Sequence, residues 1–161
     1  MQCTHVIGID PGLVHTGVVR MVFEPGSKKV YVSHEAIVGL DTAGVQQWIE
    51  DLPAGDPIIF IEGYRPRGNL HGDNRMVAAV SEMRAATGGT VLNNTGVKKV
   101  VRRPLMELLG VWSFSTVTHH QDLRSAARIA LLGMLKDDDL NSLLADVVSD
   151  HINGRTWHVE Y

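Results

Sequence analysis

Two short apolar segments of this 161-residue chain each stop at an acidic residue. Residues 5–10 end at Asp10, and residues 57–62 end at Glu62. Continuous apolar runs of this length are typical of strands buried inside a sheet. If the two strands are parallel neighbours, both carboxylates emerge at the same edge, about 4.8 Å apart, and can share one cation. Open α/β sheets form their binding sites at this edge.

The rest of the chain alternates between strand and helix patterns. Strands are predicted over 17–23, 30–38 and 90–92, and Pro25-Gly26-Ser27 supplies the turn of a hairpin. Helical patterns cover 42–52, 74–87, 97–109, 119–135 and 140–152, and Pro104 is a point at which the third of these can divide. Short links make the first three strands antiparallel, and helical crossovers make the later ones parallel. The predicted fold class is therefore α/β, with a mixed five-stranded sheet and helices on both faces.

Composition narrows the class of protein. Hydrophobic residues make up 44% and charged residues 20% of the chain, as in soluble globular domains. The single cysteine, Cys3, excludes an intramolecular disulfide and a cysteine-rich zinc site. No apolar run is long enough to span a bilayer, and the N-terminus has no signal-peptide pattern. We therefore expect a cytoplasmic protein with no membrane partner.

Charge is distributed unevenly along the chain. The net charge is −5 over residues 1–62, +7 over 63–136 and −5 over 137–161. A protein that binds a phosphate backbone needs a basic face rather than a basic total. The middle of the chain can supply this face, or it can be basic without any such role.

A third acid, Asp122, lies at the start of the strongest predicted helix, three residues after His119. This spacing places both side chains on one helical face. Taken singly, the strand-end acids serve as turn or capping residues, and Asp122 as an acid that favours the helix dipole. Together, three carboxylates and an imidazole form an oxygen-rich set suited to Mg²⁺. Two such ions about 4 Å apart would clamp the attacking and leaving oxygens of a phosphodiester displacement.

The sequence also resembles a known family. Residues 8–17 have the form G-I-D-P-G-x-x-x-T-G, which is similar to the opening signature of RuvC-type Holliday-junction resolvases, within the ribonuclease H-like nuclease superfamily. Ile61-Glu62 looks like the second catalytic segment of that family, and His119-His120-Gln121-Asp122 looks like the third. The resemblance covers residues 5–135. It implies a single ribonuclease H-like nuclease domain over 1–161, with 136–161 as a divergent C-terminal extension.

The resemblance also implies functional roles. The implied catalytic and metal-binding residues are Asp10, Glu62, His119 and Asp122. They would hold two Mg²⁺ ions, for which Mn²⁺ substitutes. Many members have an aspartate where this chain has His119, which acts here either as a metal ligand or as a general base. The compact length resembles bacteriophage members, for which the compartment is the host cytoplasm.

Basic and aromatic residues in the middle of the chain are candidates for DNA binding. The candidates are Arg65, Arg67, Lys98, Lys99, Arg102, Arg103, Arg124 and Arg128, together with Tyr64. Each basic group either contacts phosphates or forms a solvated face, and the resemblance implies a phosphate contact for Lys98 or Lys99. The Tyr64 ring either stacks on a base or sugar or packs within the protein.

The expected function is that of an endonuclease that cleaves Holliday junctions, or related branched DNA such as flaps or forks. One alternative is a non-catalytic branched-DNA-binding protein of the same fold. A weaker alternative is an actin-like ATP-binding phosphotransferase, which would need two further glycine-rich phosphate loops. A two-fold symmetric junction calls for a homodimer. The helix over 74–87 either supplies that interface, through Met76, Val77, Val80 and Met83, or packs on the sheet.

Overall fold

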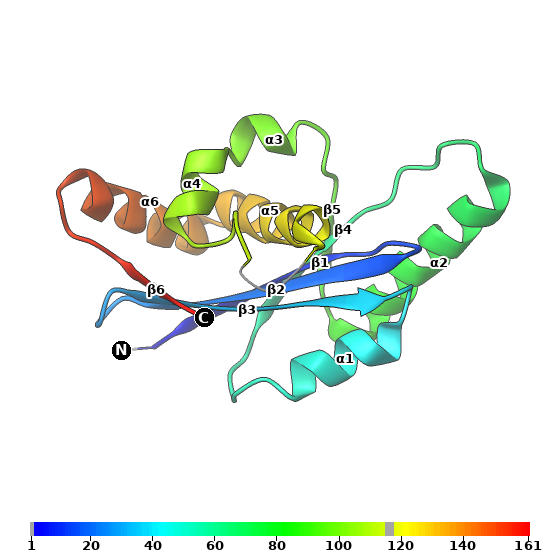
Figure 1. Cartoon of the computed structure of the whole chain (residues 1–161), viewed down its shortest axis with the longest axis horizontal. Helices are drawn as coiled ribbons and strands as arrows, with labels where there is room; N and C mark the ends of the chain where they lie inside the picture. The colour runs from blue at the N-terminus through cyan, green and yellow to red at the C-terminus, as the bar shows by residue number, and fades with distance from the viewer. Residues whose placement is uncertain (1, 115–117) are drawn as a thin grey trace.

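A computed structural model of the chain describes residues 2–114 and 118–161, in which a single mixed sheet forms the centre (Figure 1). β1 (Thr4–Asp10), β2 (His15–Glu24) and β3 (Lys29–Val38) pair antiparallel in sequence order. β4 (Ile58–Glu62) pairs parallel with β1, and β5 (Thr90–Leu92) pairs parallel with β4. The predicted change from antiparallel to parallel pairing is confirmed.

The prediction of five strands is wrong, because a sixth strand is added at the β3 edge of the sheet. β6 (His158–Glu160) pairs parallel with β3, which gives the order β5-β4-β1-β2-β3-β6. Its three residues are too few for a periodic signal. The carboxylate of Asp150 accepts hydrogen bonds from Nζ of Lys28 at 2.8 Å and from Nε1 of Trp157 at 3.0 Å. These bonds tie the C-terminal segment to the β2–β3 turn and so bring β6 beside β3.

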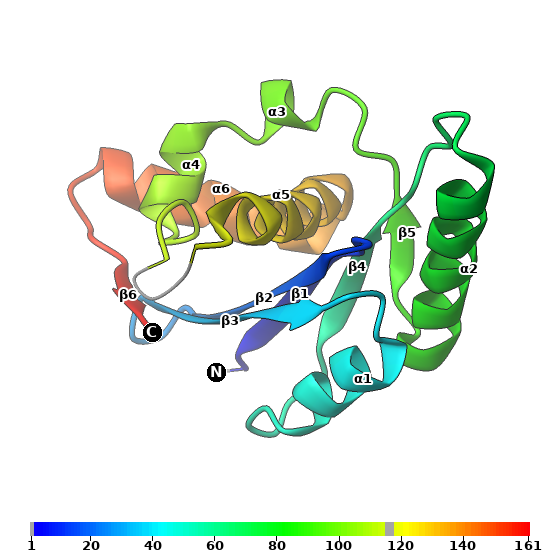
Figure 2. The same ribbon diagram turned by 45° about the vertical axis from the view of Figure 1, so that its right-hand side comes forward.

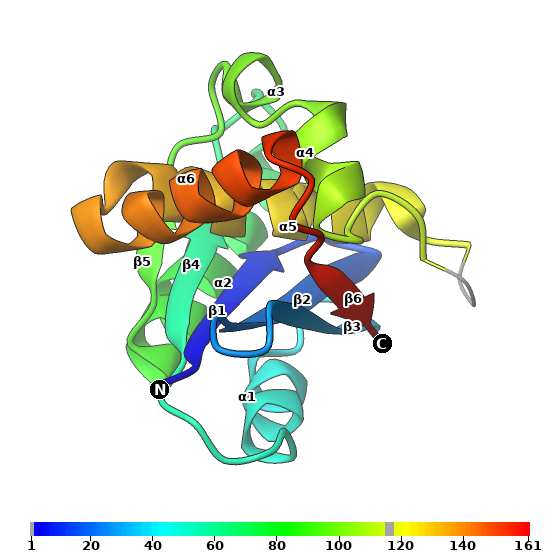
Figure 3. The ribbon, with the colours of Figure 1, turned by 90° about the vertical axis from the view of Figure 1, so that its left-hand side faces the viewer.

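The helices form two layers, one on each face of the sheet (Figures 2 and 3). α3 (Val97–Val100), α4 (Arg103–Leu108), α5 (His120–Lys136) and α6 (Asp138–Ile152) lie on one side. α1 (Thr42–Glu50) and α2 (Leu70–Thr87) cover the other. Helices on both faces were predicted, and this is confirmed. No helix among residues 2–114 and 118–161 is both long and apolar enough to cross a membrane.

Two predicted helices have different bounds in the structure. The helix expected over 97–109 is two short helices, α3 and α4, and Pro104 occupies the first turn of the second. Proline lacks an N–H group, so it suits this first turn and not a helix interior. α2 begins at Leu70 rather than residue 74, because the side chain of Asn69 caps the helix by accepting a hydrogen bond from the amide of Gly72.

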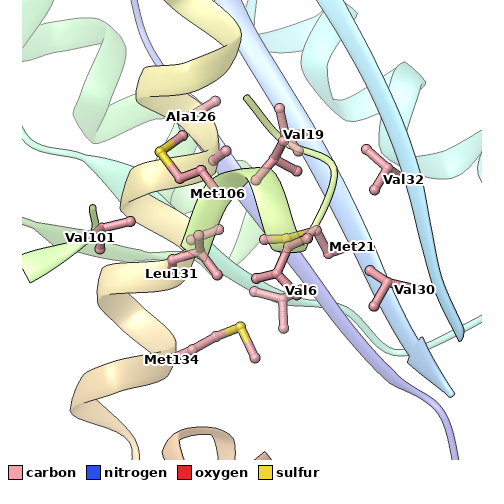
Figure 4. Close-up of a cluster of buried hydrophobic side chains, with 14 of the residues drawn as sticks. Val6, Val19, Met21, Val30, Val32, Val101, Met106, Ala126, Leu131 and Met134 are labelled. Carbon is pink, nitrogen blue, oxygen red and sulfur yellow. The ribbon is translucent and has the colours of Figure 1, made fainter. Parts of the chain in front are cut away.

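The core divides according to the two faces of β1. Val6 faces α5 and joins the larger buried cluster, in which Figure 4 shows strand side chains such as Val6 and Met21 together with helix side chains such as Met106 and Leu131. Ile7 and Ile9 point the opposite way, into a smaller cluster under α1 and α2. Strand residues alternate between faces, so β1 is buried on both sides. This double burial explains its continuous apolar sequence.

The apolar residues of α2 are largely used inside the chain. Val80 and Met83 are buried in the smaller core cluster, and Met76 is also buried. Val77 alone of the four remains half-exposed, at 50%. Of the two roles predicted for this helix, the structure therefore shows packing on the sheet.

Candidate active site

The carboxylates of Asp10 and Glu62 meet at one edge of the sheet. β1 and β4 are parallel with Ile9 opposite Ile61, so the next residue of each strand emerges at the same point. Asp10 and Glu62 line the same two adjoining cavities at this edge. The predicted juxtaposition of the two strand ends is therefore found.

Two glycines allow α5 to bring its first turn to this edge. A Cβ atom on Gly8 of β1 would overlap the backbone carbonyl of Ala126 in α5. A Cβ on Gly17 of β2 would lie 2.5 Å from the backbone oxygen of Asp122. Only residues without a side chain permit such close packing of a helix on strands. Both glycines belong to the 8–17 motif, so that motif positions α5 as well as Asp10.

The start of α5 brings His119 and Asp122 into the site. His119 is the N-cap residue, and its Nδ1 lies 3.8 Å from Oδ2 of Asp122. Each of these two side chains is 36% exposed. The structure therefore brings together all four predicted catalytic positions, two from strand ends and two from one helix end.

Burial and neighbouring carboxylates both disfavour the charged form of Asp10. Burial raises the pKa of Asp10 well above its usual value, and the hydrogen bond with Glu62 and the negative charges of Glu62 and Asp122 raise it further. The side-chain amide of Asn94 donates a hydrogen bond to Glu62. Burial and neighbouring negative charges oppose the ionisation of the Asp10 carboxyl group, and a bound cation would stabilise its charged form.

These side chains line a cleft of about 970 Å³. Its wall includes the four acidic and histidine positions above, and also Arg65 and Arg67 from the loop that follows β4. Carboxylate oxygens are the ligands that Mg²⁺ prefers, and a few of them beside substrate phosphates are enough to hold it. Asp10, Glu62 and Asp122 therefore supply the carboxylate oxygens that a hard divalent cation prefers, in a cleft that Arg65 and Arg67 also line.

A second, smaller cavity of about 250 Å³ continues from the Asp10–Glu62 pair toward the α3 side. Lys98 of α3 and Arg128 of α5 line it, together with Arg67. Burial and then the charge of Arg124 lower the pKa of Arg128, whereas the charge of Glu62 raises it. Nε of Arg128 is buried and has no hydrogen-bond partner within 2–114 and 118–161. This cavity therefore places cationic side chains directly beside the acidic ones.

The remaining basic candidates lie around Trp112 or farther along the same side. The guanidinium carbon of Arg124 lies 3.9 Å from the centre of the Trp112 ring, and that of Arg103 lies 4.7 Å from it. Nε of Arg124 also donates a hydrogen bond to the carbonyl of Trp112 at 2.6 Å. Lys99 and Arg102 are exposed and do not line either cavity. The sequence did not indicate that Arg103 and Arg124 would lie around Trp112, because they are nine and twelve positions away from it.

The loop that carries Arg65 and Arg67 is anchored by a buried acid. Asp73, 7% exposed, accepts hydrogen bonds from the Tyr64 hydroxyl and from the backbone amides of Arg67 and Gly68. Tyr64 packs against the smaller core cluster and also lines the large cleft, so its packing role is found and its stacking role stays a prediction. Asp73 thereby fixes the basic rim of the cleft, a role that the sequence analysis missed.

Asp73→Asn should loosen this loop and lower the melting temperature by roughly 5 °C at neutral pH. The Tyr64 hydrogen bond, followed by that from the Arg67 amide, lowers the pKa of Asp73. A lowered folded-state pKa stabilises the protein above the unfolded-state value and loses that effect as the pH falls through the folded-state value. Melting curves from pH 7 to pH 3 should therefore show the gap between parent and variant closing in acid. Asp56→Asn, at an exposed position, should match the parent, and an equally large drop for both variants would contradict the anchoring role.

His15 is a site residue that the sequence analysis did not single out. It begins β2, and its ring centre lies 4.0 Å from that of His119. Ligand atoms of His15, His119 and Asp122 all lie within 4.8 Å of one another. The signal was present in the 8–17 motif, because a residue that begins the strand antiparallel to β1 must lie at the Asp10 end of the sheet.

No protein-family model matches the sequence, and no curated protein matches it significantly. Known structures do match. T. thermophilus RuvC in complex with a Holliday junction substrate aligns with a TM-score of 0.56 and 19% identity, over 80% of this chain and 91% of that one. Another Thermus thermophilus RuvC structure aligns with a TM-score of 0.53 and 19% identity, over 80% and 92% of the respective chains. The chain therefore has the RuvC fold, and the predicted ribonuclease H-like fold class is confirmed.

Proposed function

We propose that this protein is a metal-dependent endonuclease that cleaves four-way DNA junctions or related branched DNA. The observation that carries the proposal is the meeting of Asp10, Glu62 and Asp122 in one cleft with a basic rim. The fold is shared with a RuvC whose structure contains a Holliday junction substrate. We further propose that residues 1–161 act as one nuclease domain and that two copies act on one symmetric junction.

In this proposal the carboxylates of Asp10, Glu62 and Asp122 hold Mg²⁺, and Mn²⁺ substitutes for it. The ion supplies charge neutralisation and Lewis-acid polarisation of the phosphodiester. The side chains of the protein orient the DNA backbone relative to the carboxylates. His119 borders the carboxylates, where it serves either as a further ligand or as the acceptor of the proton that the attacking water loses.

The basic side chains are proposed to hold the backbone on both sides of the carboxylates. Arg65 and Arg67 line the large cleft, and Lys98 and Arg128 line the adjoining cavity. Phosphate contacts of this kind fix the position of the DNA without reading its sequence. Arg103 and Arg124, together with the exposed Lys99 and Arg102, would extend this surface along the α3–α4 side.

The non-catalytic alternative requires branched-DNA binding alone. Binding does not need three mutually repelling carboxylates, and acids near a phosphate backbone oppose binding. The crowding that raises the pKa of Asp10 therefore favours catalysis over a purely binding role. No observation favours the ATP-dependent alternative.

The test is cleavage of end-labelled four-way, three-way and flap DNAs, with a linear duplex of the same sequence as control. With Mg²⁺, we expect cuts in the branched substrates near the branch point and none in the duplex. EDTA should abolish the cuts while a native gel still shows the complex. A shifted complex with no cut in either Mg²⁺ or Mn²⁺ would support the binding-only alternative, and equal cutting of the duplex would contradict selectivity for branches.

A further inference from the structure

Two imidazoles and a carboxylate lie close together in the cleft that Asp10 and Glu62 also line. This part of the cleft offers nitrogen as well as oxygen ligands to an ion. His15 comes from the start of β2, while His119 and Asp122 come from the start of α5. The two rings lie 4.0 Å apart between centres, tilted by 36°. The ligand atoms of all three residues lie within 4.8 Å of one another.

We infer that His15, His119 and Asp122 bind a first-row transition-metal ion, of which Zn²⁺ and Co²⁺ are suitable probes, in preference to Mg²⁺. The inference rests on the proposed function for the identity of the cleft, and it adds to that function a nitrogen-containing ion position beside the carboxylates proposed to hold Mg²⁺. His15 is the new member of the site, and it makes the donor set richer in nitrogen than carboxylates alone would.

The donor chemistry separates the two kinds of ion. Mg²⁺ prefers oxygen ligands and keeps several waters, whereas imidazole nitrogen suits Zn²⁺ and its neighbours in the first transition row. Three protein ligands with an open position is the arrangement of reactive zinc sites. The set of His15, His119 and Asp122 has that composition, and Asp10 and Glu62 remain as the oxygen-only part of the cleft.

The distances suit a single ion after small side-chain rotations. Metal–nitrogen bonds of about 2.0–2.1 Å place two ligand atoms of one tetrahedral ion roughly 3.3 Å apart. Nδ1 of His119 and Oδ2 of Asp122 are already 3.8 Å apart. Neither imidazole has a hydrogen bond to another side chain or backbone group in the described ranges, apart from this approach of His119 to Asp122. Both rings are therefore free to turn toward an ion.

The backbone holds the three ligands in place before any ion binds. β2 pairs with β3 from its first residue, with His15 opposite Val38, and the amide of Gly39 donates a hydrogen bond to the carbonyl of Val14 at 2.7 Å. Gly17 admits the backbone of Asp122 against β2. Other histidines nearby are engaged elsewhere, since Nδ1 of His120 accepts a hydrogen bond from the amide of Phe114.

The test measures metal binding to the DNA-free protein, by calorimetry with Zn²⁺ and Mg²⁺ separately and by the visible absorption of Co²⁺. His15→Ala should weaken Zn²⁺ and Co²⁺ binding by roughly 10-fold or more and leave Mg²⁺ affinity within about 2-fold. His15→Asp should shift the preference back toward Mg²⁺, because it replaces nitrogen by oxygen. His151→Ala, on the exposed surface of α6, is the matched control and should change neither affinity.

Circular dichroism of each variant tests whether it is folded. If His15→Ala does not fold, the His15→Asp variant still tests the inference. Zn²⁺ affinity that is unchanged in both His15 variants would overturn the inference, as would a parent protein that binds Mg²⁺ more tightly than Zn²⁺. The outcome is separable from the proposed function. If Zn²⁺ binding depends on His15 but the protein cuts no DNA, the metal site stands and the nuclease proposal fails. If the protein cleaves junctions but Zn²⁺ binding is unaltered in the His15 variants, the nuclease proposal stands and the metal site fails.

Discussion

Asp10→Asn should reduce cleavage of a four-way junction by at least about 100-fold while leaving junction binding intact or tighter. Loss of an outer partner of a metal site already costs about 10–100-fold, and Asp10 lies at the centre of the proposed site. The change removes a negative charge that both holds the cation and repels phosphate. Single-turnover cleavage in Mg²⁺ and native-gel binding in EDTA measure the two effects separately. Cleavage within tenfold of the parent rate would reject Asp10 as a ligand.

The same substitution should stabilise the metal-free protein near neutral pH. Burial, Glu62 and Asp122 raise the pKa of Asp10, so the folded chain holds this proton more tightly than the unfolded chain does. The contribution of Asp10 to the free energy of unfolding therefore falls as the pH rises from the unfolded-state value through the raised one. Urea unfolding in EDTA at pH 7.5 should show the variant to be more stable than the parent. Asp56→Asn, at an exposed position, should alter neither cleavage nor stability.

Gly8→Ala should destabilise the fold by roughly 2 kcal/mol or more, toward the upper part of the range for overpacked cores. The added methyl group would overlap the carbonyl of Ala126, which is backbone and cannot rotate away, so α5 must move off the sheet. Movement of α5 also displaces Asp122, and cleavage should fall further than the stability alone explains. Urea unfolding monitored by circular dichroism gives the free energy of unfolding.

Gly72→Ala is the matched control for that experiment. A Cβ at this position of α2 would lie 3.5 Å from the nearest Asn69 atoms, an ordinary contact. Alanine is the better helix former, so the change in free energy of unfolding should stay within about 1 kcal/mol. Equal destabilisation by both substitutions would show that the close approach of α5 to β1 is not the cause.

The sequence was most informative where a local pattern of residue types determines both the secondary structure and the position of a functional side chain. β1 and β4 are buried on both sides and end at acids, so their pattern predicted two buried strands and, if these were parallel neighbours, the meeting of Asp10 and Glu62 at one edge. The spacing of His119 and Asp122 also predicted that these side chains lie close together, although His119 is the N-cap residue and precedes the first residue of α5.

Features that depend on long-range pairing were not accessible in the same way. His15 joins the site only because β2 folds back along β1 and α5 approaches across Gly17. β6 pairs with β3 where Asp150 connects Lys28 to Trp157 and the amide of His158 donates a hydrogen bond to the carbonyl of Lys28. In each case the partners are distant in sequence, and no local periodicity records the contact.

The lengths of β5 and β6, which lie at the two outer edges of the sheet, bear on how the protein can associate with itself. Each contains three residues. A strand this short offers few free backbone groups to template another chain, which is one way in which natural sheets resist aggregation. β6 covers only Lys29–Tyr31 of β3, so, within the part of the chain that the structure describes, residues 32–38 of that strand have a strand partner on one side only. Pairing of one sheet with another would therefore have to begin on residues 32–38 of β3, and not on the two short outer strands.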